Sequence, residues 1–396
     1  MTSAPVSVAI ANCGFDWDLG DPDALLARYH ALVGWARALA GAGARAVTVV
    51  QRFRRDAVVH REGVEYRFIA DRAGPASMWF KGARLARTVG TLRPDVVHVN
   101  GCVFPRFVRN LRRKLSPAAV IAVQDHGGSG IQDQSPGLRS LPWRRFHRFG
   151  LGAADCFLFT ANEMAAPWSR AGIIDSGQGV FEIPEASTDL GRLPSPSPYP
   201  SDQGPRLPGT PALLWVGRLD PNKDPLTILA GFERAAATLP EAALTLAFGD
   251  DKLLPEVRSR VASSPVLGPR VHLRGRVDRA DLPALYRGAD LFLLGSHREV
   301  ASFALIEALS FGVIPVVTEI PAFRVLTDAG RLGALFPPGD VDALARAIGR
   351  LARADMFALR ALVRAHFTRE LSWSALGTKA LGIYRAAVAR RRDRRN

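Results

Sequence analysis

Residues 291–312 read LFLLGSHREVASFALIEALSFG and pass from an apolar run through a polar loop into a helix-like pattern. The run 291–294 predicts a short buried strand, and the apolar residues of 303–309 recur at helical spacing. Ser302 is a residue type that commonly caps a helix start, and a helix beginning there would direct its free backbone amides toward the loop. We therefore predict a strand, a loop and a helix, with an anion-binding site where loop and helix meet.

Two glutamates, Glu299 and Glu307, bracket seven residues of this stretch. Glu307 would lie roughly 7 Å along the helix axis at ~1.5 Å per residue, whereas Glu299 would stay on the loop. Carboxylates are good acceptors for sugar hydroxyls, so a ligand with a central phosphate and a hydroxyl-bearing group on each side would fit. This layout suits a nucleotide sugar; the alternative is that both glutamates are ordinary solvated or salt-bridged acids.

Length and composition predict a globular protein of two domains. The chain has 396 residues, of which 47% are hydrophobic, and we expect no apolar run long enough to span a membrane and no secretion signal at its start. The three cysteines, Cys13, Cys102 and Cys156, are widely spaced, so neither a disulfide framework nor a zinc site is indicated. We expect a cytoplasmic protein, with peripheral attachment to the inner face of the membrane as an option.

The net charge of +15 calls for an anionic partner or reflects an arginine-rich composition. Basic clusters at 52–55, 112–114 and 144–148 all fall in the first half of the chain. If they share a face, an anionic membrane surface becomes a candidate partner. No nucleic-acid module is recognisable, and nucleic acid is not expected as a partner.

Strand-like and helix-like segments alternate in both halves of the chain, which predicts two Rossmann-like, doubly wound α/β domains. Expected domains are residues 1–190 on the acceptor side and 212–372 on the donor side, joined by a Pro/Ser/Gly-rich linker at 191–211. A C-terminal helix with a basic tail would occupy 373–396, and it could pack back on the first domain. The predicted strands are 6–11, 45–50, 64–69, 95–99, 119–123, 155–159, 180–183, 212–216, 243–247, 271–273, 291–294 and 314–317.

Cations follow the first strand of the second domain in WVGRLDPNKDP, residues 215–225. Ligands of doubly wound sheets bind outside the carboxyl ends of the strands, and Arg218 and Lys223 both belong there. A guanidinium fork and an ammonium point charge together suit a diphosphate, although surface charges are the alternative. Residues 274–277 and the Glu299 loop should reach the same edge.

The second domain resembles that of the family 4 retaining glycosyltransferases, which have two Rossmann-like domains facing across a cleft (the GT-B architecture). Residues 217–224, GRLDPNKD, resemble the family's G-R-x-x-x-x-K-G segment, and 299–307 match its E-x7-E motif. The later segments 312–317, GVIPVV, and 336–340, FPPGD, match as well. The resemblance covers nearly the whole chain and is strongest from 212 to 350.

The resemblance assigns roles to these residues. Arg218 and Lys223 would hold the donor diphosphate, Glu307 the ribose hydroxyls, and Glu299 the hydroxyls of the transferred sugar. The base would lie against Arg276 and Val277, and backbone amides at the helix start would complete the phosphate cradle. The implied catalytic residues are His126, Arg218, Lys223 and Glu299, and the implied donor-binding residues are Gly217, Arg276, Val277, Ala301, Ser302, Phe303 and Glu307.

In the first domain, His126 follows a strand and matches the place where the family often keeps a histidine near the sugar; a structural histidine is the alternative. The acceptor-side candidates are Gly14, Asp16 and Asn100. The first loop keeps only Gly14 of the usual glycine pair and carries acids such as Asp16 instead. These acids would recognise an acceptor or would simply be solvated turn residues.

The glycines that commonly follow the first glutamate of the motif are replaced by Val300, Ala301 and Ser302, which crowds a loop where phosphate needs close backbone approach. No Asp-x-Asp motif lies on a suitable loop, so we expect neither a metal nor another cofactor.

The predicted function is retaining transfer of a sugar from a UDP-sugar or GDP-sugar to a glycan, lipid-linked or small-molecule acceptor. One alternative is a nucleotide-sugar epimerase of the same architecture. The other is a basic membrane-binding or nucleic-acid-binding module with a degenerate site.

Overall fold

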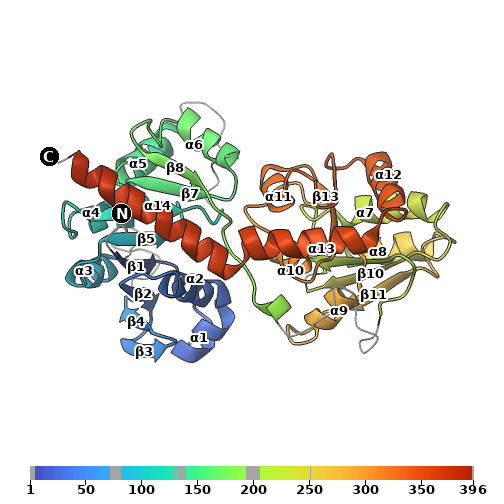
Figure 1. The fold of residues 1–396 in the computed structure, drawn as a ribbon, viewed down its shortest axis with the longest axis horizontal. Coiled ribbons are helices and arrows are strands. Elements are labelled where there is room, and N and C mark those ends of the chain that lie inside the picture. Colours follow the sequence, from blue (N-terminus) through green and yellow to red (C-terminus); the bar gives the residue numbers. More distant parts are fainter. Residues whose placement is uncertain are drawn as a thin grey trace. The chain divides into compact units, whose positions relative to one another are not determined.

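The computed structural model describes residues 5–71, 82–127, 131, 140–192, 206–249 and 251–394 (Figure 1). Contacts within the chain divide it into two units. The first contains Met1–Ala186 together with Trp373–Asn396, and the second contains Ser187–Ser372. Most of the linker expected at 191–211 lies outside the described residues.

The first unit is built on a sheet to which the described residues contribute eight strands, in the order β3-β4-β2-β1-β5-β6-β7-β8. All neighbouring pairs are parallel except β3 and β4. Strand β6 is buried along its whole length, as expected when helices cover both faces of a parallel sheet. The strands are β1 (Ser7–Asn12), β2 (Ala46–Phe53), β3 (Ala57–Arg61), β4 (Val64–Ala70), β5 (Val96–Asn100), β6 (Val120–Gln124), β7 (Cys156–Phe159) and β8 (Gly179–Glu182).

The sequence pattern did not predict β3, the antiparallel strand at the edge of this sheet. Every residue of β3 is exposed or half-buried, and its apolar run is limited to residues 57–59, which is too short to mark a strand by itself. The hairpin comes from Glu62 and Gly63, which form a two-residue loop and both have positive φ, at 49° and 74°. Two consecutive left-handed residues are the requirement of the tight turn that matches strand twist.

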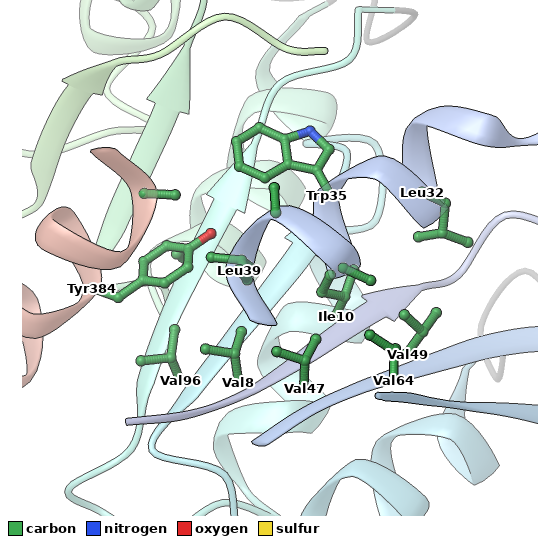
Figure 2. Packing of buried hydrophobic residues seen from close by; sticks show 14 of the residues in the cluster. Val8, Ile10, Leu32, Trp35, Leu39, Val47, Val49, Val64, Val96 and Tyr384 are labelled. Carbon is green, nitrogen blue, oxygen red and sulfur yellow. The ribbon is translucent and has the colours of Figure 1, made fainter. Parts of the chain in front are cut away.

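Helix α2 (His30–Gly41) and the last helix, α14 (Trp373–Asp393), pack together against the first sheet. Their ring systems meet edge to face, with 5.9 Å between the centroids of Trp35 and Trp373. A Cβ added at Gly34 would lie 2.2 Å from the Trp373 ring, so this glycine permits the close approach. Figure 2 shows Trp35 from α2 and Tyr384 from α14 in the same apolar cluster. The remaining α-helices described in the first unit are α1 (Pro22–Arg28), α3 (Ala83–Thr91), α4 (Pro105–Arg112), α5 (Leu141–Leu151) and α6 (Ala166–Arg170).

The second unit has a parallel sheet to which the described residues contribute six strands, in the order β11-β10-β9-β12-β13-β14. The chain order reverses between β9 and β12, which creates the switch point where doubly wound sheets bind ligands. The short strand β14 was not predicted. The strands are β9 (Ala212–Gly217), β10 (Ala243–Phe248), β11 (Val271–Gly275), β12 (Leu291–Leu294), β13 (Ile314–Thr318) and β14 (Ala334–Phe336). The helices are α7 (Pro225–Ala236), α8 (Leu254–Ala262), α9 (Leu282–Gly288), α10 (Phe303–Ser310), α11 (Pro321–Leu326), α12 (Val341–Leu351) and α13 (Met356–His366).

The predicted fold class is confirmed: the chain folds into two α/β units, each around a mainly parallel sheet. In the described ranges, no helix is both long enough and apolar enough to cross a bilayer.

Candidate active site

A cavity of about 530 Å³ lies at the carboxyl edge of the second sheet, around the switch point between β9 and β12. It brings together every residue predicted for the site in the second unit except Glu307. The predicted residues that line it are Gly217, Arg218, Lys223, Arg276, Val277, Glu299, Ala301, Ser302 and Phe303. Val216, Ala247, Phe248, Gly249, Leu282 and Ala304 complete the described lining.

The loop from β9 to α7 presents the two cations predicted for the diphosphate. Asp220 Oδ1 accepts a hydrogen bond from the Lys223 backbone N–H at 2.9 Å, and Asp220 Oδ2 lies 3.0 Å from Arg218 Nε. The loop ends at Asp224, which has a left-handed backbone (φ 44°) and caps α7 by accepting from the Thr227 N–H. The Arg218 side chain remains 62% exposed, so it can turn toward a ligand in the cavity.

The loop from β12 to α10 is tied to this first loop by Asn222. The Asn222 side chain donates to the Arg298 carbonyl at 3.0 Å and accepts from the Arg298 N–H at 3.1 Å. The Asn222 carbonyl also accepts from the His297 N–H at 2.8 Å. These bonds hold the neighbours of Lys223 and Glu299 side by side, which fixes the spacing of the two charged residues.

Lys223 Nζ and Glu299 Oε1 form an ion pair, and each side chain is only 12% exposed. The two residues are 76 positions apart in the chain, so their pairing comes from the fold. In the structure the carboxylate balances the ammonium charge. A diphosphate that entered the cavity would compete with Glu299 for Lys223.

Helix α10 begins as predicted. Ser302 caps it, with its side chain accepting from the Leu305 N–H at 3.4 Å, and Ser302, Phe303 and Ala304 all line the cavity. The first amides of a helix have no partner within the helix and carry partial positive charge. The helix start therefore adds to the positive field in the cavity.

Glu307 lies outside the cavity lining. It is buried, and it accepts hydrogen bonds from the Tyr286 hydroxyl at 2.9 Å and from Arg279 Nη1 at 3.2 Å. Burial raises the pKa of the Glu307 carboxyl, while Tyr286 and Arg279 oppose this rise. In the structure Glu307 ties α10 to the region of α9, and its role toward a ribose stays a prediction.

In the first unit, His126 follows β6 and is paired with Glu185, which sequence reasoning missed. His126 Nδ1 lies 2.5 Å from Glu185 Oε1. The backbone of Glu185 is itself fixed, because its carbonyl accepts from Trp35 Nε1 at 2.6 Å and its N–H donates to Thr160 Oγ1 at 3.3 Å. Glu185 comes three residues after β8, and the rule that polar groups at strand ends share one sheet edge could have found it.

Asn100 ends β5. His98, two residues earlier in the same strand, is part of the core. His98 is fully buried, its Nδ1 contacts the Tyr384 hydroxyl, and its ring centroid lies 5.6 Å from that of Trp35. Burial lowers the pKa of His98 to about 3, so this imidazole is neutral. We read His98 as a packing residue.

Gly14 and Asp16 lie on the loop after β1, and both are held by the protein itself. The Gly14 carbonyl accepts from Gln51 Nε2 at 3.0 Å, and Asp16 Oδ2 accepts from the Tyr29 hydroxyl at 2.8 Å. The bond from Tyr29 lowers the pKa of Asp16. Asp23, in the first turn of α1, pairs with Arg61, so Asp16 and Asp23 both fasten this region to the fold.

No group of three or more His, Cys, Asp or Glu side chains in the described part of the chain is placed to hold a metal ion. Asp250, beside the cavity residue Gly249 in the chain, lies outside that part.

Comparisons with known proteins match both halves of the chain to glycosyltransferases. A profile for "Glycosyl transferases group 1" matches residues 210–354, and one for a "Glycosyl transferase 4-like domain" matches residues 22–178. A mannosylfructose-phosphate synthase from Agrobacterium fabrum is 31% identical over 189 residues, which is 43% of this chain and only 39% of that relative. A GDP-mannose:cellobiosyl-diphosphopolyprenol alpha-mannosyltransferase from Xanthomonas campestris is 28% identical over 312 residues, 76% of both chains.

A sucrose-phosphate synthase structure from Thermosynechococcus elongatus matches 97% of this chain and 100% of its own, with a TM-score of 0.68 and 20% identity. At that identity the match shows the fold, which is that of the GT-B glycosyltransferases. With both halves matched in order by glycosyltransferase profiles, the chain belongs to the family 4 glycosyltransferases.

Proposed function

We propose that this protein is a retaining glycosyltransferase that moves a hexosyl group from a nucleoside diphosphate sugar to an acceptor hydroxyl. The observation that carries the proposal is the cavity at the switch point of the second sheet, where Arg218, Lys223 and Glu299 meet the start of α10. A diphosphate needs positive charge and N–H donors, and a sugar needs an acceptor for its hydroxyls. All three requirements are met by groups that line one cavity.

The charges of the cavity support stabilisation of a departing diphosphate. Arg218, Lys223 and Arg276 line it, while Glu299 supplies a carboxylate that Lys223 already neutralises. Donors fixed where negative charge develops are usually the largest single contribution to catalysis of this kind. We infer that the diphosphate takes over Lys223 from Glu299, and that Glu299 then accepts hydrogen bonds from the transferred sugar.

Retention of the anomeric configuration is part of the proposal. Among the described lining residues Glu299 is the carboxylate, and its ion pair with Lys223 leaves it poorly suited to attack carbon. We therefore favour attack by the acceptor on the face that the leaving phosphate vacates, with that phosphate assisting removal of the acceptor proton. We propose that His126 is the catalytic residue of the first unit and that the reaction needs no metal or other cofactor.

For the donor, we propose GDP-mannose as the first candidate and a UDP-hexose as the second. Mannose appears in the names of two relatives, one of which also names GDP-mannose. The names of these two relatives do not agree on one acceptor. One names a diphosphopolyprenol-linked sugar, and the other names a phosphorylated mannosylfructose. A lipid-linked glycan, another glycan or a small sugar phosphate are the acceptors to test. We place the enzyme in the cytoplasm, attached peripherally to the inner face of a membrane.

A panel of nucleotide sugars tests the proposal. We expect one donor to raise the melting temperature, and release of nucleoside diphosphate to depend on an added acceptor. Mass spectrometry then identifies the product, and proton NMR gives its anomeric configuration. An inverted anomer would overturn retention, whereas interconversion of the donor sugar without transfer would identify an epimerase instead.

A further inference from the structure

Helices α4 and α5 of the first unit form a basic surface without any acidic residue. Residues 105–114 contain five arginines or lysines and residues 140–152 contain three, while neither segment contains Asp or Glu. Arg112 is used internally, since it pairs with Asp155 at 2.5 Å. The rest of this charge lies on side chains that are exposed or half-buried, including Arg113, Lys114 and Arg145. We call these two helices and the residues of the two segments the α4–α5 face.

The two helices are locked together, so their charges belong to one surface. A Cβ added at Gly150 would lie 2.2 Å from the Pro105 carbonyl group, which shows how closely α5 approaches the start of α4. The Arg109 guanidinium also lies over the Phe149 ring, 4.9 Å from its centroid. This contact places a cation of α4 directly against an apolar side chain of α5.

The outer side of α5 carries large apolar residues between its arginines. Leu141, Phe146 and Phe149 are 38%, 38% and 54% exposed. At about 100° per residue they share one arc of the helix with Arg145 and Arg148, which are also exposed.

The opposite side of α5 is buried in the interior of the first unit. His147, Gly150 and Leu151 are buried there, and the His147 ring stacks on Trp143 with 3.8 Å between centroids. Phe146 and Phe149 therefore lie outside the face by which α5 packs into the protein.

We propose that the α4–α5 face binds an anionic lipid bilayer. Its arginines and lysines would contact the lipid phosphates, while Phe146 and Phe149 would enter the boundary between headgroups and acyl chains. The apolar residues favour a bilayer over a partner that offers only phosphate groups. Phosphate contacts alone would leave Leu141, Phe146 and Phe149 in water, whereas insertion into a bilayer would remove these side chains from water. The inference specifies the surface behind the proposed peripheral location and is independent of the transfer reaction.

Vesicle flotation tests this proposal with the full chain. Vesicles of phosphatidylcholine with about 30% phosphatidylglycerol should carry the protein at low salt, whereas pure phosphatidylcholine should not. Each surface cation contributes roughly a fivefold change in affinity, so R145E with R148E should weaken binding by more than about tenfold. F146S with F149S should remove the part of the binding that survives high salt, because exposed charge interactions are screened and apolar insertion is not.

Matched controls come from the second unit. R258E with R346E reverses two exposed arginines, and F357A removes an exposed ring, and neither change should alter flotation. Equal binding of the α5 variants and wild type, or failure of wild type to bind anionic vesicles, would overturn the proposal. So would retention of a DNA oligonucleotide through Arg145 and Arg148 without any vesicle binding.

Calorimetry with GDP and UDP separates this question from the enzymatic one. The α5 variants should bind nucleotide like wild type, and circular dichroism with thermal unfolding should show that both units remain folded, since α5 and the nucleotide cavity belong to different units. Loss of a cooperative unfolding transition in the α5 variants alone would mean that they are misfolded, and then F146A and F149A singly, which change less surface, decide the outcome by flotation. If the wild-type protein binds vesicles but no nucleotide, the proposed function is wrong and the proposed lipid-binding surface is still supported.

Discussion

The carboxyl edges of the two sheets differ in how their polar residues are used. At the edge of the second sheet, charged side chains line a cavity of about 530 Å³ and retain some access to it. At the edge of the first sheet, His126 is paired with Glu185 and Asp16 is tied to Tyr29. The same topological position thus gives an open cation site in one unit and internal ion and hydrogen-bond pairs in the other, where His126 Nε2 and Asn100 Oδ1 are buried without a hydrogen-bond partner among the described residues.

This difference shows what strand-end position can and cannot reveal. Loops after parallel strands gather at one edge whatever their composition. Whether their polar groups face a ligand or each other depends on the space that neighbouring side chains leave. Four substitutions test the contrast, in order of decreasing expected effect.

Lys223→Ala should have the largest effect, because it removes the mostly buried cation of the cavity in the second unit. We expect transfer activity to fall by about 10³-fold, as when a fixed donor to a developing charge is lost. Stability should also fall, by about 2 kcal/mol, because Glu299 keeps a mostly buried charge without its partner. Steady-state kinetics and urea unfolding measure the two losses.

Lys252→Ala, at an exposed lysine of the same unit, is the matched control and should change neither quantity. Adding Glu299→Gln to Lys223→Ala should recover stability without recovering activity. Full activity of Lys223→Ala would show that the diphosphate assignment is wrong.

Arg218→Ala should lower activity by about 10²-fold with little loss of stability. The Arg218 side chain is largely exposed, and its partner Asp220 keeps the hydrogen bond from the Lys223 backbone. The loss should appear both in nucleotide affinity, measured by calorimetry, and in kcat/KM. Arg258→Ala in α8 provides the control. Equal kinetics for the two variants would show that Arg218 does not belong to the site.

Glu185→Gln asks whether the network of the first unit serves the reaction. If Glu185 orients His126, we expect kcat to fall by about 10-fold with KM nearly unchanged, because the imidazole loses the partner that fixes its ring. Glu182→Gln, at a nearby acid that accepts from the Asn162 N–H, should leave both kcat and KM unchanged.

A double variant makes this test specific. Glu185→Gln should cost nothing further once His126→Ala is present, because residues that act as a unit are not additive. Independent losses in the double variant would mean that Glu185 supports the fold rather than His126.

Glu307→Gln should have the smallest effect and separates a buried structural acid from a site residue. Because burial raises the pKa of Glu307 in the folded state, its native form binds more protons than the unfolded chain above the usual pKa of 4.5. The free energy of unfolding of wild type, relative to Glu307→Gln, should therefore be highest below pH 4.5 and should decline as the pH rises through the folded pKa.

Urea unfolding of both proteins across this range measures that difference, in which contributions from other carboxyls cancel. A pH-independent difference would contradict the raised pKa. A loss of nucleotide affinity above about 10-fold would instead place Glu307 at the ribose, as the sequence predicts.

The sequence by itself determined the two α/β units, the helix cap at Ser302 and nine of the fifteen described residues that line the cavity of the second unit. These features depend on local patterns: apolar runs mark buried strands, cap residues mark helix starts, and the ends of parallel strands converge. The same patterns could not predict β3, because the apolar run of this exposed edge strand is only three residues long and its turn depends on two positive φ angles.

Only the tertiary structure decided which charged groups pair. Lys223 meets Glu299 across 76 residues, and His126 meets Glu185 across 59, while Glu307 turns away from the cavity lining toward Tyr286 and Arg279. Such pairs form when packing brings distant segments within hydrogen-bonding distance and leaves them little water. A periodic pattern specifies which face of an element is buried, but it carries no information about which distant side chain will be found there.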